Sequence, residues 1–379
     1  MDIDLSHPAV SDLRRTARRR IPRFAFEYLD SGTGDLELLV QRNRDALDAV
    51  LFMPDILVGE VDPSWETEFM GETYGRPFGI APVGMSGLMW PGAERLLAKT
   101  AAANRIPYTL STVATKLPEE IGPVAGDMGW FQLYVPAADD IRQDILARAK
   151  AAGFKKLIFT VDLPADSRRE RQRRANLSLP PKVTPSFVWQ LLTHPRWSIE
   201  TLREGKPRIA LPESYTKSKD SRSSLEHAGH LIRGKPDWET LRKIREEWDG
   251  DLILKGILDP ELARRVMDAG ADGIWVSNHS GRQFEPGPAA IDALPKIREA
   301  LPDAPLIFDS GVASGMDVMR ALALGADFVM LGRAWHYAVA AMGQRGIEHL
   351  IHILTDDMKL NMAQIGAHDL GDLSRRLIR

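Results

Sequence analysis

The sequence predicts an α/β protein whose strands close into an eight-stranded parallel barrel. Short β-rich runs alternate with longer helical patterns along the chain, which is the arrangement of parallel βα units. Eight runs qualify as strands, and each has an apolar interior followed by polar residues at its carboxyl end. The carboxyl ends of barrel strands build the active site, so this recurring pattern favours a TIM (β/α)8 barrel over a doubly wound sheet.

Length and composition are compatible with one barrel and additional segments. The chain has 379 residues, of which 44% are hydrophobic, and a barrel takes roughly 250. We therefore expect a single domain over residues 1–379. The net charge of −3 gives no electrostatic reason for nucleic-acid binding. The absence of cysteine excludes disulfides, thiolate metal sites and cysteine nucleophiles.

Residues 1–62 precede the first strand and have a helical pattern. Residues 30–35 (DSGTGD) interrupt it and predict a break between two helices. Residues 1–5 are acidic and lack the apolar core of a secretory signal. No uninterrupted apolar run is long enough to cross a bilayer. We therefore expect a cytoplasmic protein.

The barrel itself is expected to occupy residues 63–162 and 238–345. Its strands are predicted at residues 78–81, 108–111, 130–134, 157–162, 252–255, 273–276, 306–309 and 328–331. Helical patterns lie between them, for example at residues 94–104, 141–152, 260–269 and 316–324. Residues 346–379 are expected to form a C-terminal helical segment.

Residues 163–237 form a long insertion after the fourth strand. The segment contains eight prolines and no convincing strand. Loops of this length are usually functional or disordered. Within it, residues 186–199 include the apolar run 187–192 and Trp197. We favour packing of these residues on the barrel, and peripheral contact with the inner face of a membrane is the alternative.

The clearest chemical signal follows the sixth strand. Residues 277–283 (SNHSGRQ) place His279 three positions before Arg282. A histidine can accept a proton near neutral pH and an arginine can hold a carboxylate bidentately, so the pair suits oxidation of a 2-hydroxy acid. A single His-x-x-Arg is more often structural than catalytic, and the surrounding pattern of polar strand ends supports the catalytic interpretation.

A phosphate site is predicted near the C-terminal end of the barrel. Residues 309–315 (DSGVASG) lead from the seventh strand into a helix, and Gly332 and Arg333 follow the eighth strand. Glycines let backbone N–H groups approach an anion, and a helix N-terminus adds a favourable dipole. Barrel enzymes often bind phosphate between these loops, which favours this interpretation over two merely tight turns. There is no Gly-x-Gly-x-x-Gly fingerprint near the start and no P-loop, which argues against a Rossmann nucleotide domain.

Several motifs in one order resemble the FMN-dependent 2-hydroxy acid dehydrogenase and oxidase family. They are the segments 131–134 (FQLY), 160–162 (TVD), 254–256 (LKG), 277–283, 321–327 (ALALGAD) and 332–333 (GR). The resemblance covers nearly the whole chain, and the insertion, with LTHPRW at 192–197, is most similar to the bacterial L-lactate dehydrogenase branch. It implies an FMN cofactor and oxidation of an L-2-hydroxy acid to the 2-oxo acid.

The resemblance implies a catalytic role for four residues. His279 would take a proton from the bound hydroxy acid, and Asp162 would hold the imidazole and stabilise its cation. Tyr134 would hydrogen-bond the substrate hydroxyl. Lys255 would lie by the flavin N1 and C2 oxygen, where a fixed positive charge favours the reduced anionic ring.

The resemblance also implies the binding residues. Arg169, Arg282 and Tyr28 would bind the substrate carboxylate, with Tyr134 on the hydroxyl. The flavin contacts would come from Ala81, Pro82, Val83 and Gly84 through backbone, from Ser111, Gln132, Thr160, Lys255 and Ser277 through side chains, and from Asp309, Gly311, Gly332 and Arg333 at the ribityl phosphate. Electrons would leave to a quinone, a carrier protein or dioxygen, and the family resemblance implies a homotetramer. We expect no metal, because no histidine has metal-ligand spacing supported by further ligands.

Some positions depart from the family pattern. Ala313 replaces an arginine in the phosphate loop, and Ser280 replaces a glycine beside His279. Asp166 takes a commonly apolar position, while Val113, with Gly84, suggests room for a substrate side chain larger than methyl. Two alternatives therefore stay open: an FMN barrel of the type 2 isopentenyl-diphosphate isomerase kind without net oxidation, and a catalytically inactive binding protein.

Overall fold

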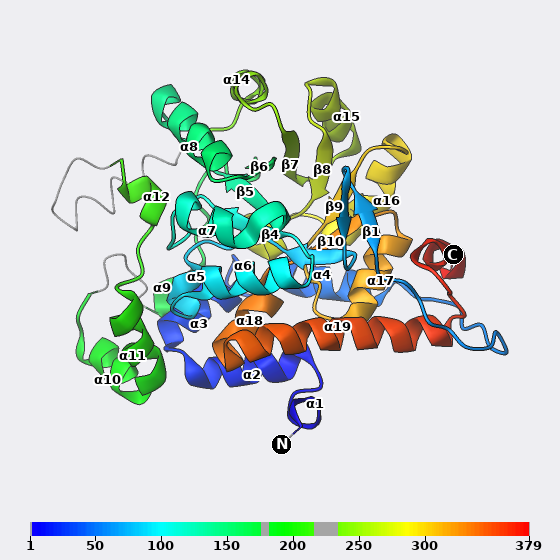
Figure 1. Cartoon of the computed structure of the whole chain (residues 1–379), viewed down its shortest axis with the longest axis horizontal. Coiled ribbons are helices and arrows are strands. Elements are labelled where there is room, and N and C mark those ends of the chain that lie inside the picture. Colours follow the sequence, from blue (N-terminus) through cyan, green and yellow to red (C-terminus); the bar gives the residue numbers. More distant parts are fainter. Residues whose placement is uncertain (1, 176–181, 216–233, 379) are drawn as a thin grey trace.

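Eight parallel strands form the closed barrel that the sequence predicts (Figure 1). The computed structural model describes residues 2–175, 182–215 and 234–378. In the order in which they pair around the barrel, the strands are β10 (Phe328–Leu331), β3 (Phe78–Ile80), β4 (Tyr108–Ser111), β5 (Gly129–Leu133), β6 (Lys156–Thr160), β7 (Asp251–Ile257), β8 (Gly273–Val276) and β9 (Leu306–Phe308). The prediction of a TIM barrel is confirmed.

Helices connect the strands and cover the outside of the barrel. Outside the insertion, those described between β3 and β10 are α5 (Ser86–Met89), α6 (Ala93–Ala103), α7 (Pro118–Ala125), η1 (Gly126–Met128), α8 (Asp139–Ala151), α14 (Trp238–Glu247), α15 (Pro260–Asp268), η2 (His279–Gly281), α16 (Ala290–Ala300) and α17 (Gly315–Ala323). After β10 come α18 (Arg333–Met342), α19 (Gln344–Gln364) and η3 (Leu370–Arg376). The helical patterns expected from the sequence correspond to α6, α8, α15 and α17.

Side chains alternate along each barrel strand between the interior and the surrounding helices. Outward residues pack with the helices in one large buried cluster, and inward residues form a second cluster inside the barrel. The fully buried members of the inner cluster on the strands are Trp130, Ile158, Ile253, Trp275, Ile307, Phe328 and Met330. The amino-terminal half of the barrel is therefore filled by side chains.

A hairpin that the sequence analysis did not predict closes the amino-terminal end of the barrel. β1 (Thr67–Phe69) pairs antiparallel with β2 (Glu72–Tyr74). Phe69 and Tyr74 belong to the inner cluster, and their ring centroids lie 5.4 and 5.2 Å from that of Phe328. The Trp130 indole N–H donates to the Tyr74 hydroxyl at 3.3 Å, so the buried polar groups satisfy each other.

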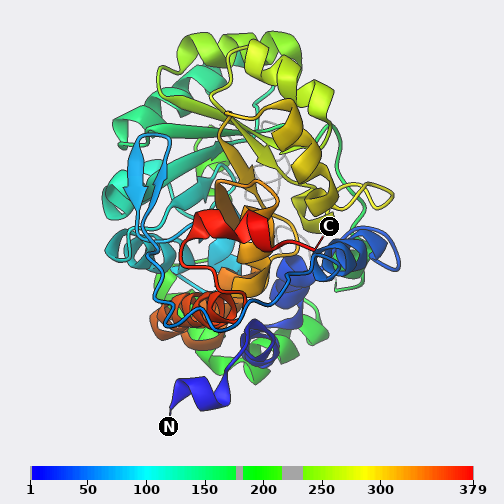
Figure 2. The same cartoon turned by 90° about the vertical axis from the view of Figure 1, so that its right-hand side faces the viewer.

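The N-terminal part is helical over a shorter range than expected. It contains α1 (Ile3–Ser6), α2 (Val10–Arg20), α3 (Arg23–Asp30) and α4 (Leu38–Asp48), and the predicted break lies between α3 and α4. Residues 49–62 form no helix, in contrast to our expectation, and they run along the C-terminal end of the chain. Phe52 bridges Leu377, and Figure 2 shows the red C-terminal end beside blue N-terminal segments.

The described part of the insertion is helical and lies to one side of the barrel (Figure 1). It contains α9 (Glu170–Arg174), α10 (Pro185–Thr193), α11 (Pro195–Glu204) and α12 (Ala210–Glu213). Trp197 is 3% exposed and its indole N–H donates to the Leu88 carbonyl at 3.0 Å. Phe187 stacks on Phe24 at 5.4 Å, so one face of these helices packs on the protein as we favoured. Within the described ranges, no helix has the length and apolar character needed to span a bilayer.

Candidate active site

The polar residues of the site occupy the inward positions that follow the apolar inner cluster. Alternation places Ser277 two residues after Trp275, Asp309 two residues after Ile307 and Lys255 two residues after Ile253, all at the carboxyl ends of their strands. This period of two is the physical reason why polar strand ends in the sequence converge at one mouth of the barrel.

Lys255 is the centre of a buried polar cluster. Its Nζ donates to Ser277 Oγ at 2.6 Å and forms an ion pair with Asp309 Oδ2 at 2.7 Å. Ser277 Oγ in turn donates to Asp309 Oδ1 at 2.6 Å. The indole of Trp275 lies 4.9 Å from Lys255 Nζ and donates to Asp309 at 3.0 Å. Lys255 is only 4% exposed, so these contacts hold its positive charge in one place.

A second polar row crosses three neighbouring strands. Ser111 donates to the Gln132 side-chain carbonyl at 2.9 Å, and the Gln132 amide donates to Thr160 Oγ1 at 3.1 Å. Thr160 lines the cavity, whereas Ser111 and Gln132 lie behind it. The row fixes the orientation of the Thr160 hydroxyl, which the sequence analysis assigned to the flavin.

His279 and Asp162 come together at the mouth although 117 positions separate them. The imidazole Nδ1 lies 3.2 Å from Asp162 Oδ1. Gly256 makes this contact possible, because a Cβ at that residue would lie 2.6 Å from the Asp162 Cβ. His279 itself has a left-handed backbone with φ of 55°, which turns the side chain into the cavity after β8.

Burial and the carboxylate act in opposite directions on His279. Burial lowers the pKa of the imidazole below its ordinary value and outweighs the opposite effect of Asp162. Burial raises the pKa of Asp162, but the attraction of His279 and Lys255 keeps the net pKa below the ordinary value. At neutral pH the pair is therefore a neutral imidazole beside a carboxylate, which is the state of a base ready to accept a proton.

Three guanidinium groups lie around the same space. Arg169, Arg282 and Arg333 all line the cavity with His279. Arg282 Nη1 donates to the carbonyls of Tyr28 and Ser31, each at 2.9 Å, at the carboxyl end of α3. Burial and the repulsion of Arg169 and Arg333 lower the pKa of Arg282 to about 9. Such a concentration of positive charge favours a bound anion.

Two tyrosines complete this side of the cavity. Burial and the charge of Asp162 raise the pKa of Tyr134 above its ordinary value, so its hydroxyl stays neutral and can donate a hydrogen bond. The ring of Tyr28 lies 5.7 Å from the Arg282 guanidinium carbon. Both residues line the cavity.

Most of the residues that the sequence analysis selected surround one cavity of about 660 Å³. Those that line it are Tyr28, Ala81, Pro82, Val83, Gly84, Tyr134, Thr160, Arg169, Lys255, His279, Arg282, Asp309, Gly332 and Arg333. The sequence analysis missed the lining residues Leu29, Met85, Val135, Leu163, Pro164, Ala165, Ile209, Gly234, Lys235 and Pro236. Met85 adjoins the selected 81–84 loop, but Ile209 and 234–236 come from the insertion, which carries no pattern that would place them here.

The predicted phosphate loop divides into two parts with different surroundings. Gly332 and Arg333 at the start of α18 line the cavity. Gly311 instead packs on α4, where an added Cβ would lie 3.0 Å from Leu47 Cδ1. The Ala313 amide donates to buried Asp317 at 2.9 Å. The Ala313 amide before α17 is thus occupied by a carboxylate of that helix, whereas the start of α18 faces the cavity. A phosphate contact of Gly311 stays a prediction.

These features describe a barrel with a buried lysine, a histidine paired with a carboxylate, and three arginines around one cavity. A family model described as FMN-dependent dehydrogenase matches residues 17–379. The chain belongs to this family and is an FMN-dependent oxidoreductase. The inactive-protein and isomerase alternatives have no support in this match.

Named relatives cover almost the entire chain. It is 38% identical over 97% of its length, and 96% of the relative, to the L-lactate dehydrogenase of Pseudomonas aeruginosa (strain LESB58). It is 40% identical to the L-lactate dehydrogenase of Xanthomonas axonopodis pv. citri (strain 306), covering 97% and 95% of the two chains. Among solved structures, the monotopic membrane protein (S)-mandelate dehydrogenase superposes with a TM-score of 0.90, 34% identity and 98% coverage of both chains.

The cavity suits FMN in size and in donor set. About 660 Å³ lies within the range of protein cofactor sites. Gly332 leaves its surroundings open, since an added Cβ would be 3.4 Å from the nearest side-chain atom, on Val83. The Arg333 guanidinium and the start of α18 supply positive charge for a phosphate, and Lys255 supplies it at the barrel axis.

Proposed function

We propose that this protein oxidises an L-2-hydroxy acid to the 2-oxo acid. The observation that carries the proposal is that the His279–Asp162 pair, Arg169 and Arg282 face one cavity with Lys255. A base and two carboxylate-binding groups are what removal of a proton from a bound hydroxy acid requires. The relatives named L-lactate dehydrogenase and (S)-mandelate dehydrogenase support the same reaction class.

Each side chain has a role that its geometry supports. Arg169 and Arg282 bind the substrate carboxylate, and Tyr28 and Tyr134 orient the carboxylate and hydroxyl by hydrogen bonds. His279 accepts the substrate proton at Nε2, because Nδ1 faces Asp162. FMN, when bound, would accept the two electrons together with the remaining hydrogen of the substrate, which leaves the 2-oxo acid. Asp162 then stabilises the imidazolium.

The remaining predicted residues form the cofactor side. Residues 81–84 supply backbone contacts to the ring, with Thr160 as a hydrogen-bonding side chain. Gly332 and Arg333 bind the phosphate. A carboxylate would repel a phosphate, so we assign Asp309, held by Ser277 and Lys255, to ribityl hydroxyl groups instead.

The part of the cavity away from Lys255 suits a substrate side chain larger than methyl. Apolar side chains of the cavity wall include Val113, Val135, Leu163 and Ile209. Gly84 packs directly on Val113, since an added Cβ would be 2.5 Å from the valine Cγ2, so the proposal rests on the apolar wall and not on free space beside Gly84. We therefore propose branched or aromatic 2-hydroxy acids ahead of lactate.

Anaerobic reduction of the bound flavin tests the proposal. Purified protein should be yellow and should bleach with L-2-hydroxy acids, fastest with branched or aromatic ones. His279→Ala should lower this rate by at least ~100-fold while FMN stays bound. Bleaching that is undiminished in His279→Ala would refute the assigned base. Protein that binds FMN but oxidises no member of a wide hydroxy acid panel, or colourless protein that cannot be reconstituted, would refute the function.

The outer face of α10 and α11 supports peripheral contact with a membrane, although the inner face packs on the barrel. Trp189, Leu192 and Leu202 are 67%, 70% and 84% exposed. Arg18 of α2 and Arg23 of α3 line a second cavity with His194, so basic groups adjoin this apolar face. We propose that the face rests on an anionic lipid surface, where a membrane quinone could take the electrons.

Vesicle sedimentation distinguishes this location from a purely soluble one. The holoenzyme should sediment with anionic phosphatidylglycerol vesicles, and Trp189→Ser with Leu192→Ser should abolish this without changing flavin bleaching. Unchanged sedimentation of the double variant would contradict the assigned face. A homotetramer, which the family resemblance implies, is checked by light scattering of the same preparation.

A further inference from the structure

The short helix α9 presents Arg169 to the active site but cannot hold its own position. Arg169 is the residue before the helix and has a left-handed backbone with φ of 45°, which is unfavourable for a non-glycine residue. The helix has five residues and none of them is buried. A helix of this length has no stability of its own, so contacts with the rest of the protein must fix it.

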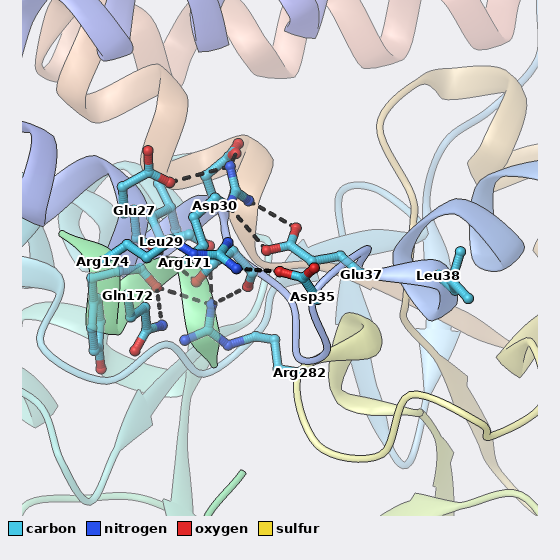
Figure 3. A network of polar contacts seen from close by, with 12 residues as sticks. Glu27, Leu29, Asp30, Asp35, Glu37, Leu38, Arg171, Gln172, Arg174 and Arg282 are labelled. Carbon is cyan, nitrogen blue, oxygen red and sulfur yellow. Dashed lines mark hydrogen bonds and ion pairs between the residues drawn. The ribbon is translucent and has the colours of Figure 1, made fainter. Parts of the chain in front are cut away.

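Arg171 supplies most of those contacts (Figure 3). Its Nε and Nη2 donate to the two carboxylate oxygens of Glu37 at 2.9 and 3.0 Å. Its Nη1 donates to Asp30 at 2.7 Å and forms an ion pair with Glu27 at 3.2 Å. One guanidinium thus joins α9 to the end of α3 and to the residue before α4. We call the four residues Glu27, Asp30, Glu37 and Arg171 the α9 clasp.

The clasp is anchored in the protein interior. Asp30 is 5% exposed and also accepts hydrogen bonds from Arg14 Nε at 2.6 Å and from the Tyr337 hydroxyl at 2.6 Å. Burial raises the pKa of Asp30, but the hydrogen bonds from Arg14 and Tyr337 dominate and keep it below the ordinary range. The carboxylate is therefore charged at neutral pH, and it has a fixed position before Arg171 reaches it.

The same segment connects the clasp to the second carboxylate-binding arginine. The Tyr28 carbonyl accepts hydrogen bonds from Gln172 of α9 at 3.1 Å and from Arg282 Nη1 at 2.9 Å. Figure 3 shows Arg171, Gln172 and Arg282 gathered around the end of α3. The positions of Arg169 and Arg282 thus depend on one short piece of backbone, residues 28–31.

We infer that Arg171 is a positioning residue that sets the location of Arg169 relative to Arg282 and so determines the affinity for the substrate carboxylate. The inference rests on the proposed function, because it takes Arg169 to bind that carboxylate. Arg171 is not among the residues that line the cavity, and it reaches the site through α9 and the end of α3. Its loss should therefore weaken binding of the acid more than binding of FMN, because Arg333 also donates to the Ser280 carbonyl, outside residues 28–31.

Steady-state and binding measurements on the holoenzyme test this role. In Arg171→Ala, KM for the hydroxy acid and Kd for the 2-oxo acid, read from the flavin difference spectrum, should rise roughly 10- to 100-fold. The values of kcat and of Kd for FMN should change less than about threefold. Arg171→Lys, which keeps the charge but loses the bidentate geometry, should fall between wild type and Arg171→Ala.

Arg174→Ala is the matched control. Arg174 lies on the same helix, is 57% exposed and pairs only with exposed Asp35 among the described residues, so its loss should leave KM near the wild-type value. Both variants also remove one trypsin site from the same helix. Cleavage after Arg168 and Arg169, followed by mass spectrometry, should be faster in Arg171→Ala than in Arg174→Ala.

The two readouts separate the inference from the proposed function. If the wild-type holoenzyme oxidises no hydroxy acid and binds no oxo acid, the proposed function fails, and proteolysis still tests the clasp. Equal cleavage of the two variants would overturn the clasp. Unchanged KM and Kd in Arg171→Ala would overturn the positioning role. A rise in KM accompanied by comparable losses of kcat and of FMN affinity would overturn it as well.

Discussion

Asp162→Asn tests how much the carboxylate contributes to proton removal by His279. In the reaction the imidazole becomes a cation 3.2 Å from an Asp162 oxygen. For unit charges at this distance and an effective dielectric constant of about 20, Coulomb's law gives about 5 kcal/mol. Asparagine keeps a hydrogen bond to Nδ1, so we expect about half of this to be lost. Since about 1.4 kcal/mol corresponds to a tenfold change, flavin reduction should slow roughly 70-fold.

The assay is anaerobic stopped-flow reduction of the bound FMN at saturating hydroxy acid. The same substitution in a His279→Ala background should have almost no further effect, because Asp162 acts through the imidazole. A loss below about fivefold in the single variant, or additive losses in the double variant, would refute this reasoning. Unchanged FMN absorbance and thermal stability would show that the variant is folded.

Three further predictions concern His279 and two residues close to it, Gly256 and Ser280. The base must be neutral and burial lowers the pKa of His279 below 6.5, so the acid limb of kcat/KM should begin below that value; an acid limb that begins at pH 7.5 or higher would contradict this. Gly256→Ala places a Cβ 2.6 Å from the Asp162 Cβ at φ of +106° and should lower kcat by about 100-fold with an unchanged circular dichroism spectrum; full activity would contradict the close approach. Ser280→Gly relieves a left-handed residue with φ of 53° and should raise the free energy of unfolding by about 1 kcal/mol in urea denaturation; a decrease would show that the Ser280 side chain is needed.

The fold and the centre of the site could be predicted because both depend on short sequence periods. Alternation along strands places Trp275, Ile307 and Ile253 inside the barrel, and therefore Ser277, Asp309 and Lys255 at its mouth. The contact between the Trp275 indole and Lys255 was not predicted, although the same alternation places both side chains inside the barrel.

Other parts of the site could not be predicted because they depend on contacts between distant segments. Nothing in the local sequence shows that Ile209 or Lys235 reaches the cavity. The glycines of the 309–315 loop predict an anion site, but they do not show that the Ala313 amide donates to the buried Asp317 carboxylate. Arg171 lies in a run of arginines that is typical of a solvated surface, and only the fold brings Asp30 and Glu37 to it.

The β1–β2 hairpin closes the amino-terminal end of the barrel, so the catalytic cavity does not open at that end. Phe69 and Tyr74 close the amino-terminal end together with the inner cluster, so in the described part of the chain small molecules reach the cavity from the carboxyl-terminal end of the barrel. The incoming acid, the departing oxo acid and the oxidant that regenerates the cofactor then share one approach. We expect the oxo acid to compete with the oxidant during turnover, and double-reciprocal plots of the two-substrate kinetics to give parallel lines.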